Sequence, residues 1–308
     1  MSSRYLNVFL AITLLACSPG EDRDVPVPVR ERDAFPVDER PVVRFGVVSR
    51  NNPILMYRSY QPIMDYLSAH TPYRFELKLG KSYRDAVELL DNGETDMAYL
   101  DGVTYLMAHE QFGALPLVKS LNEEGEPFYR SVFIVREDSP LRDLADLKGH
   151  SLALGSGYST SGNLIPRCEL ARIGIVLEEL RNFAYVPHHD LVARKVLEGE
   201  FDAGVVKDAI ARKYKEKGLR ALFFSEPIPS HPLTVRPDFP DSVRQVVVEV
   251  MLGLSSVGGE QREEMREWDE EFRYGFVPAS DADYKPLRQK MNDLPGGCSQ
   301  GCHGQKSF

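Results

Sequence analysis

The sequence predicts an α/β fold of two similar lobes, because one helix–strand pattern occurs twice. The segments DAVELLDNGETDMAYLDGVTY (85–105) and DLVARKVLEGEFDAGVVKDAI (190–210) share this pattern. Each has apolar residues at helical spacing, then Gly-Glu, then an Asp before a short apolar strand, and finally a second Asp. Helices that alternate with such strands form mostly parallel sheets flanked by helices. Independent origin of the two patterns is the alternative, since helix–Gly–strand junctions are common.

Other stretches fit this plan. A first strand is expected at Arg44–Ser49, followed by a helix that Asn51 or Asn52 can cap. Further strands are expected at Phe75–Leu79, Ser131–Arg136, Leu152–Leu154, Tyr185–Pro187, Leu222–Phe224 and Leu233–Val235, and the last helices at about 239–273. The first predicted lobe comprises about 42–132 and 234–290, and the second comprises about 133–233. The chain is expected to cross the hinge between them near Ser131–Phe133 and near Ile228–Thr234.

Length and composition limit the size of the core and the class of partner. The chain has 308 residues, 43% of them hydrophobic, which is enough for two ordinary domains. The net charge is −9 and no basic patch stands out, which argues against a nucleic-acid partner. Since this charge repels anions at long range, an anion site must depend on short-range donors.

The N-terminus has the proportions of a signal peptide. Arg4 precedes the apolar run Leu6–Ala16, which is too short to span a bilayer as a mature helix. The ending Leu-Leu-Ala-Cys is similar to a bacterial lipobox, so residues 1–17 are predicted to be a lipoprotein signal with lipidation at Cys17. A simple secretory signal is the alternative. Residues 18–41 are rich in proline and charge and are predicted to be a disordered tether.

Residues 291–308 are predicted to be a flexible tail that contains two cysteines, Cys298 and Cys302. In an oxidising compartment these could form a local disulfide. The sequence CSQGCH is one residue longer than the usual c-type haem attachment pattern, so haem attachment through Cys298, Cys302 and His303 is the alternative. Two Cys and one His lack an obvious fourth zinc ligand, and no other cofactor or metal is predicted.

The glycine-rich stretch GSGYSTSG (155–162) is the principal candidate for a binding element. It follows a predicted strand and precedes a helix-like run, and it has five hydroxyl-bearing residues. A helix N-terminus offers free N–H groups to an anion, whereas a simple helix cap needs only one hydroxyl. We therefore expect Ser159, Thr160 and Ser161 to bind an oxyanion, with capping as the alternative.

Several polar residues follow other predicted strands. Because ligands of α/β sheets bind beyond the carboxyl ends of strands, Asp101, His189 and Asp208 are expected to face the same cleft. The alternatives are helix caps for the two aspartates and a surface turn for His189. Tyr105 is either a cleft wall or an ordinary core aromatic.

Together these segments resemble the phosphonate-, phosphite- and phosphate-binding proteins of ABC importers (PhnD-like). The similarity runs from about Val42 to Arg288 and rests on the lipobox, Tyr83–Asp101, GSGYSTSGNLIP, the HHD turn, EPIPSHP and YGFVPASDADYKPLR. The resemblance implies a type II periplasmic-binding-protein fold, with two lobes joined by a hinge that close over a ligand. It also implies a monomeric periplasmic protein with a membrane permease as partner. The sequence shows no nucleophile–base pair at a diagnostic spacing and no P-loop, so we do not expect an enzyme.

The resemblance further implies roles for single residues. The 159–161 loop would hold the oxyanion, His189 matches a family histidine that contacts it, and Asp208 falls at or next to a family carboxylate. Aminoalkylphosphonate binders have a carboxylate near EPIPSHP, where this chain has His231. This difference favours phosphate, phosphite or methylphosphonate as the ligand. An oxyanion sensor that partners a membrane histidine kinase, or a binding protein with a haem tail, are the alternative functions.

Overall fold

A computed structural model describes residues 38–48, 53–254, 262–263 and 265–294. The predicted signal peptide, the tether up to residue 37, and the four residues Cys17, Cys298, Cys302 and His303 lie outside this part of the chain. The described residues from Arg40 onward group as one compact unit, which contains both predicted lobes. None of the described helices is long and apolar enough to cross a membrane.

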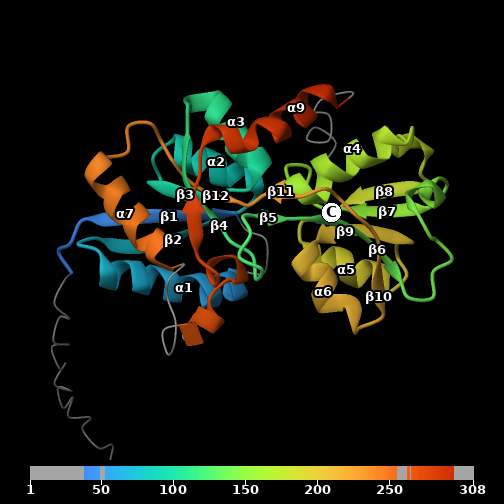
Figure 1. The fold of residues 1–308 in the computed structure, drawn as a ribbon, viewed down its shortest axis with the longest axis horizontal. Helices are drawn as coiled ribbons and strands as arrows, with labels where there is room; N and C mark the ends of the chain where they lie inside the picture. Colours follow the sequence, from blue (N-terminus) through green and yellow to red (C-terminus); the bar gives the residue numbers. More distant parts are fainter. Residues whose placement is uncertain (1–37, 49–52, 255–261, 264, 295–308) are drawn as a thin grey trace, which may run out of the picture. The chain divides into compact units, whose positions relative to one another are not determined.

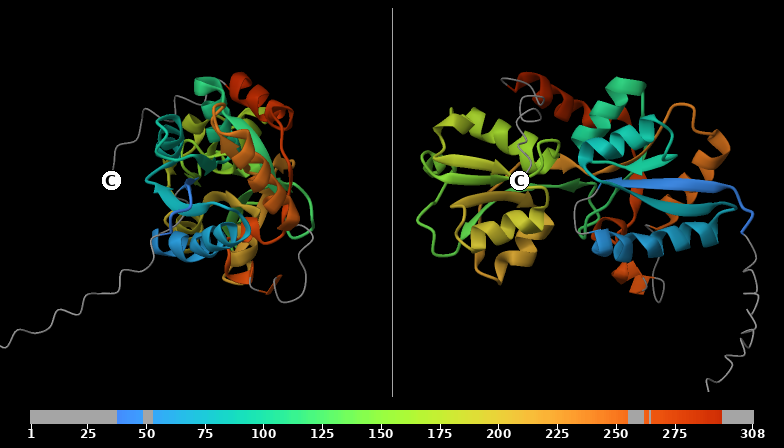
Figure 2. Two further views of the ribbon diagram at one scale, coloured as in Figure 1. Left: turned by 90° about the vertical axis from the view of Figure 1, so that its left-hand side faces the viewer. Right: turned by 180° about the vertical axis from the view of Figure 1, so that it is seen from behind.

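The first lobe is built on a six-stranded sheet of order β13–β4–β12–β3–β1–β2 (Figure 1). Its strands are β1 (Val42–Val48), β2 (Arg74–Gly80), β3 (Met97–Tyr99), β4 (Leu115–Ser120), β12 (Pro232–Val235) and β13 (Phe276–Pro278). Its helices are α1 (Pro53–His70), α2 (Tyr83–Asp91), α3 (Gly102–Phe112), α7 (Asp241–Gly253) and α9 (Lys285–Asp293). Helix α1 covers one face of the sheet, and α2 and α3 cover the other (Figure 2). Buried Phe45, Tyr99 and Phe272 pack edge to face in its core.

The second lobe has a five-stranded sheet of order β10–β6–β9–β7–β8. Its strands are β6 (Ser131–Arg136), β7 (Ser151–Leu154), β8 (Asn182–Tyr185), β9 (Ala203–Lys207) and β10 (Leu219–Phe224), and its helices are α4 (Ile165–Arg172), α5 (His189–Leu197) and α6 (Asp208–Lys215). Short helical turns complete the two lobes: η1 (Leu144–Leu147), η2 (Thr160–Leu164), η3 (Leu177–Glu179), η5 (Met265–Glu267), η6 (Glu270–Phe272) and η7 (Asp281–Tyr284).

The two repeated segments fold alike, as α2–β3–α3 and α5–β9–α6. Strand β3 pairs in parallel with β1, and β9 pairs in parallel with β7. Both sheets are mixed. In the first, β12 is antiparallel to β3 and β4, and β13 is antiparallel to β4; in the second, β6 is antiparallel to β9 and β10. The predicted two-lobed α/β fold is therefore confirmed.

A two-stranded antiparallel ribbon of β5 (Phe128–Tyr129) and β11 (Ile228–Pro229) lies where the chain passes between the sheets (Figure 1). The predicted crossing points differ from the observed ones by a few residues. Ser131 and Val132 pair with β9 in the second sheet instead of belonging to the first lobe. Pro232 and Leu233 belong to the first sheet instead of the second lobe. Pairing with a neighbouring strand, which the linear sequence does not show, sets these boundaries.

Candidate ligand-binding site

The glycine-rich loop closes through a contact between its first glycine and the turn η2. The Gly155 N–H donates to the Gly162 carbonyl at 2.8 Å. A Cβ built on either glycine would lie 2.7–2.8 Å from the other's Cα, which is closer than real Cβ atoms approach backbone. These two glycines are therefore required for the loop to close, and the closed loop presents residues 159–161 at the start of a helical segment.

Each of the three predicted loop residues makes contacts within the chain. The Ser159 hydroxyl accepts a hydrogen bond from the Gly162 N–H at 3.1 Å, which is a capping contact. The Thr160 hydroxyl accepts from the Val103 N–H of the first lobe at 2.9 Å. The Ser161 carbonyl accepts from a serine hydroxyl of β6 at 2.7 Å. The capping alternative thus applies to Ser159, while oxyanion binding by this loop stays a prediction.

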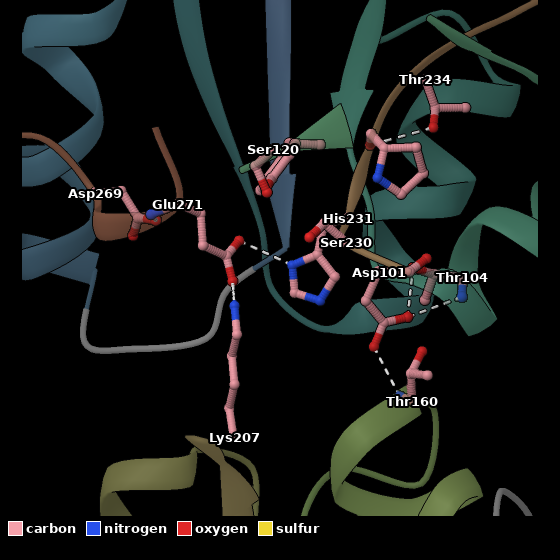
Figure 3. A network of polar contacts seen from close by, with 12 residues as sticks. Asp101, Thr104, Ser120, Thr160, Lys207, Ser230, His231, Thr234, Asp269 and Glu271 are labelled. Atoms are coloured by element: carbon pink, nitrogen blue, oxygen red, sulfur yellow. Dashed lines mark hydrogen bonds and ion pairs between the residues drawn. The ribbon is translucent and has the colours of Figure 1, made fainter. Parts of the chain in front are cut away.

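Asp101 combines a helix cap with a contact to the other lobe. Its Oδ1 accepts from the Thr104 N–H at 3.0 Å, which caps α3, and its Oδ2 accepts from the Thr160 N–H at 2.9 Å (Figure 3). The carboxylate is buried. The start of the loop's helical segment therefore already receives an anionic oxygen, which comes from the chain itself.

His231 belongs to a network of polar groups that joins the lobes. Its Nδ1 lies 2.8 Å from Glu271 Oε2, and the other oxygen of Glu271 forms an ion pair with Lys207 Nζ (Figure 3). Glu271 lies in η6 of the first lobe, whereas Lys207 ends β9 of the second. The segment EPIPSHP has His231 at this place, and Glu271 brings a carboxylate to it from a distant part of the sequence.

Tyr129, in the ribbon between the sheets, connects this polar network with the loop. Its ring packs edge to face on His231 at 5.0 Å between centroids, and Lys207 Nζ lies 4.7 Å from its centroid. Burial, followed by the negative charges of Asp101 and Glu271, raises the pKa of the Tyr129 hydroxyl well above its ordinary value. The hydroxyl lies beside Ser161 without a hydrogen bond of good geometry. It is thus a buried donor that a ligand oxygen could satisfy.

A cavity of about 140 Å³ opens beside these residues. Ser120, Tyr129, Lys207, Ser230 and Glu271 are among its lining residues. Hydroxyl, ammonium and carboxylate groups from both lobes therefore border one space, where they could bind a small polar ligand.

Asp208 also lines this cavity. Its carboxylate accepts from the Arg130 N–H at 3.2 Å and from the Ala209 N–H at 2.9 Å, at the start of α6. The structure thus brings Asp101, Thr160, His231 and Asp208 to the region where the lobes meet.

Two predicted site residues, Tyr105 and His189, are not among the residues that line this cavity. The Tyr105 hydroxyl donates to Asp281 at 2.8 Å, and its fully buried ring packs on Tyr284, so this tyrosine is a core aromatic that joins α3 to η7. His189 is half-buried at the first position of α5. Its neighbour His188 lines a second cavity, of about 560 Å³, together with residues of α1, α5 and α6.

Sequence reasoning missed Lys207, Glu271 and Tyr129. Lys207 had a detectable signal, because it occupies the position that the apolar Leu100 has in the first repeat, directly before the second Asp. A charged residue at the end of an otherwise apolar strand indicates that the side chain faces a polar site. Glu271 lies 64 residues from Lys207 and in no pattern that relates the two.

Comparison with known proteins matches residues 45–284 to the family model described as "ABC transporter, phosphonate, periplasmic substrate-binding protein". The chain is 24% identical to the phosphate-import protein PhnD of Mycolicibacterium smegmatis over 85% of its own length and 88% of the relative's. It is 22% identical to the phosphonates-binding periplasmic protein of Escherichia coli, covering 82% and 76% of the two chains. The structure of PhnD1 from Prochlorococcus marinus in complex with methylphosphonate has the same fold, with a TM-score of 0.73, 18% identity and coverage of 83% and 99%.

Proposed function

Since the chain belongs to the family of periplasmic substrate-binding proteins of phosphonate ABC transporters, we propose that it captures a small phosphorus oxyanion between its lobes. The observation that carries this proposal is the contact between the Thr160 N–H and the Asp101 carboxylate at the start of η2. A backbone donor at a helical N-terminus, buried and facing an anionic oxygen, is the chemistry that an oxyanion needs. The captured ligand would then pass to a membrane permease.

Ligand capture would use opening and closing of the lobes. Tyr129, Lys207 and Glu271 border the cavity and are largely buried where the lobes meet, so separation of the lobes would expose them to a ligand. An oxyanion bound to the loop and to groups of the first lobe would contact both sides and so favour closure. The ribbon of β5 and β11 is the place where the chain can bend.

The ligand class that we propose is phosphate, phosphite or a simple phosphonate. The names of two relatives specify phosphate import and phosphonate binding, and a third protein of this fold was solved with methylphosphonate. Hydroxyls of Ser120, Tyr129 and Ser230 near the cavity can donate to such oxygens. We also propose that Cys17 carries a lipid anchor, which would hold the protein outside the cytoplasm.

A thermal-shift screen of purified protein against phosphate, phosphite, methylphosphonate, sulfate and chloride tests the ligand class. At a concentration of about 100 Kd, a ligand of the folded state stabilises it by about 2.7 kcal/mol. We expect at least one phosphorus oxyanion to produce such a shift while chloride does not. The proposal is overturned if no phosphorus oxyanion shifts the unfolding temperature more than chloride does.

A further inference from the structure

We infer that Lys207 acts as a built-in substitute for a ligand ammonium group, and that it makes the site select oxyanions without an amine. This inference rests on the proposed function, because it concerns the selectivity of the same site. Its evidence is the pairing of Lys207 with Glu271 at the wall of the cavity.

Both oxygens of the Glu271 carboxylate are engaged. Oε1 pairs with the ammonium of Lys207, and Oε2 lies 2.8 Å from His231 Nδ1. The side chain of Glu271 is only 5% exposed. A carboxylate buried to this extent requires a positive partner, since an unpaired buried charge is strongly unfavourable. The chain itself supplies that partner.

The surroundings of Lys207 are those of a bound ammonium ion. Its Nζ lies against the carboxylate and 4.7 Å from the centroid of the Tyr129 ring, a distance at which a cation is attracted to an aromatic face. Carboxylate and aromatic ring come from outside the second lobe, whereas Lys207 reaches them from the end of β9. Closure of the lobes therefore inserts an ammonium group into a cation site, as an amine-bearing ligand would.

Selectivity follows from competition for this cation site. An aminoalkylphosphonate carries a negative phosphonate and a positive ammonium, and its ammonium would have to displace Lys207 from Glu271. Displacement would leave Lys207, whose side chain is 14% exposed, without its partner. Methylphosphonate has no ammonium and leaves the ion pair intact, so it should bind in preference.

A direct contact between Lys207 and the ligand oxyanion is the competing explanation, and two variants distinguish it. Calorimetry would compare methylphosphonate and 2-aminoethylphosphonate on the parent protein, on Lys207→Met and on Lys207→Met/Glu271→Gln. In the single variant Glu271 loses its ammonium partner and keeps the contact with His231, so we expect methylphosphonate to bind roughly tenfold more weakly and 2-aminoethylphosphonate to bind roughly tenfold more tightly. In the double variant the carboxylate is removed together with the ammonium, so methylphosphonate affinity should return to within about threefold of the parent.

If the double variant does not regain methylphosphonate affinity, or if the single variant gains none for 2-aminoethylphosphonate, the inference is overturned. Lys207→Arg keeps the positive charge and should keep the parent's preference, which provides a second test if Lys207→Met does not fold. Failure of the parent protein to bind methylphosphonate, phosphite or phosphate overturns the proposed function instead. The two failures are therefore distinguishable in one set of titrations.

Discussion

Thr160 and Asp101 join the two lobes through one hydrogen bond, in which the Thr160 backbone N–H donates to Asp101 Oδ2 at 2.9 Å. The same carboxylate caps α3 through Thr104. The Asp101 side chain thus stabilises a helix in its own lobe and accepts a hydrogen bond from a backbone N–H of the other lobe. A ligand oxyanion that uses the Thr160 N–H must compete with this carboxylate.

Replacement of Asp101 by Asn tests this competition. Asparagine caps helices about as well as aspartate, so α3 should remain intact while the negative charge disappears. A hydrogen bond to a charged group is worth about 1.5–3 kcal/mol, so we expect methylphosphonate and sulfate to bind roughly tenfold more tightly or better. Asp143→Asn, which changes the cap of η1, is the matched control and should leave both affinities unchanged. Weaker binding by Asp101→Asn would instead identify the carboxylate as a ligand contact.

Ser159→Ala should affect stability more than affinity. Its hydroxyl caps the Gly162 N–H, and loss of such a cap typically costs about 1 kcal/mol of the free energy of unfolding. Oxyanion affinity, measured by calorimetry on the folded variant, should change less than about threefold. Loss of affinity by roughly a factor of ten or more, with stability unchanged, would contradict the capping role.

Gly155→Ala should destabilise the loop. The new methyl group would meet the Cα of Gly162 at 2.8 Å, so the backbone must move and the Gly155–Gly162 hydrogen bond is disturbed. We expect a loss of about 1–3 kcal/mol in unfolding free energy, measured by denaturant titration. The control is Gly253→Ala at the end of α7, where a Cβ meets nothing within 4 Å and the variant should be neutral or slightly more stable.

Acid should weaken the contact that Asp281 makes with α3 and α9. The hydrogen bond from Arg288, followed by the one from Tyr105, lowers the pKa of the Asp281 carboxyl, although partial burial opposes this. Because the folded-state pKa is depressed, the stabilisation is present above the unfolded pKa of about 4 and is lost as pH falls through the lower folded value. Solvent screening limits the effect to below about 1 kcal/mol.

The difference in unfolding temperature between the parent and Asp281→Asn should therefore shrink as pH falls from about 5 to about 2. Asp138→Asn, which alters an exposed carboxylate near Arg136, is the control and should show a small difference at every pH. A difference for Asp281→Asn that stays constant through this range would mean that the ionised carboxylate is not the stabilising form.

Cys17→Ser should release the protein from membranes. The Leu-Leu-Ala-Cys sequence predicts that the cysteine carries acyl chains, and serine cannot accept the thioether-linked lipid. Fractionation of cells that produce parent and variant, with mass measurement of the mature N-terminus, tests this. Equal membrane association and equal mass in both would contradict lipidation.

Local pattern was sufficient to predict the two lobes. The repeated segments 85–105 and 190–210 carry helical periodicity, a glycine at the helix end and a short apolar strand, and they form α2–β3–α3 and α5–β9–α6. The position of the loop 155–162 between β7 and α4 was predictable for the same reason, because strand, glycine and capping preferences act over a few neighbouring residues.

The tertiary structure decided which side chains contact one another. Alternation and capping preferences say that Asp101 can begin a helix, but not that its second oxygen meets Thr160, 59 residues away. They cannot show that Tyr105 contacts Asp281 rather than a ligand, or that His231, Glu271 and Lys207 form one polar network. The sequence by itself therefore determined which elements exist and which residues can bind an anion. Only the packing of the lobes decided which of those groups already have a partner, because ion pairing and burial depend on distances that close when the whole chain folds.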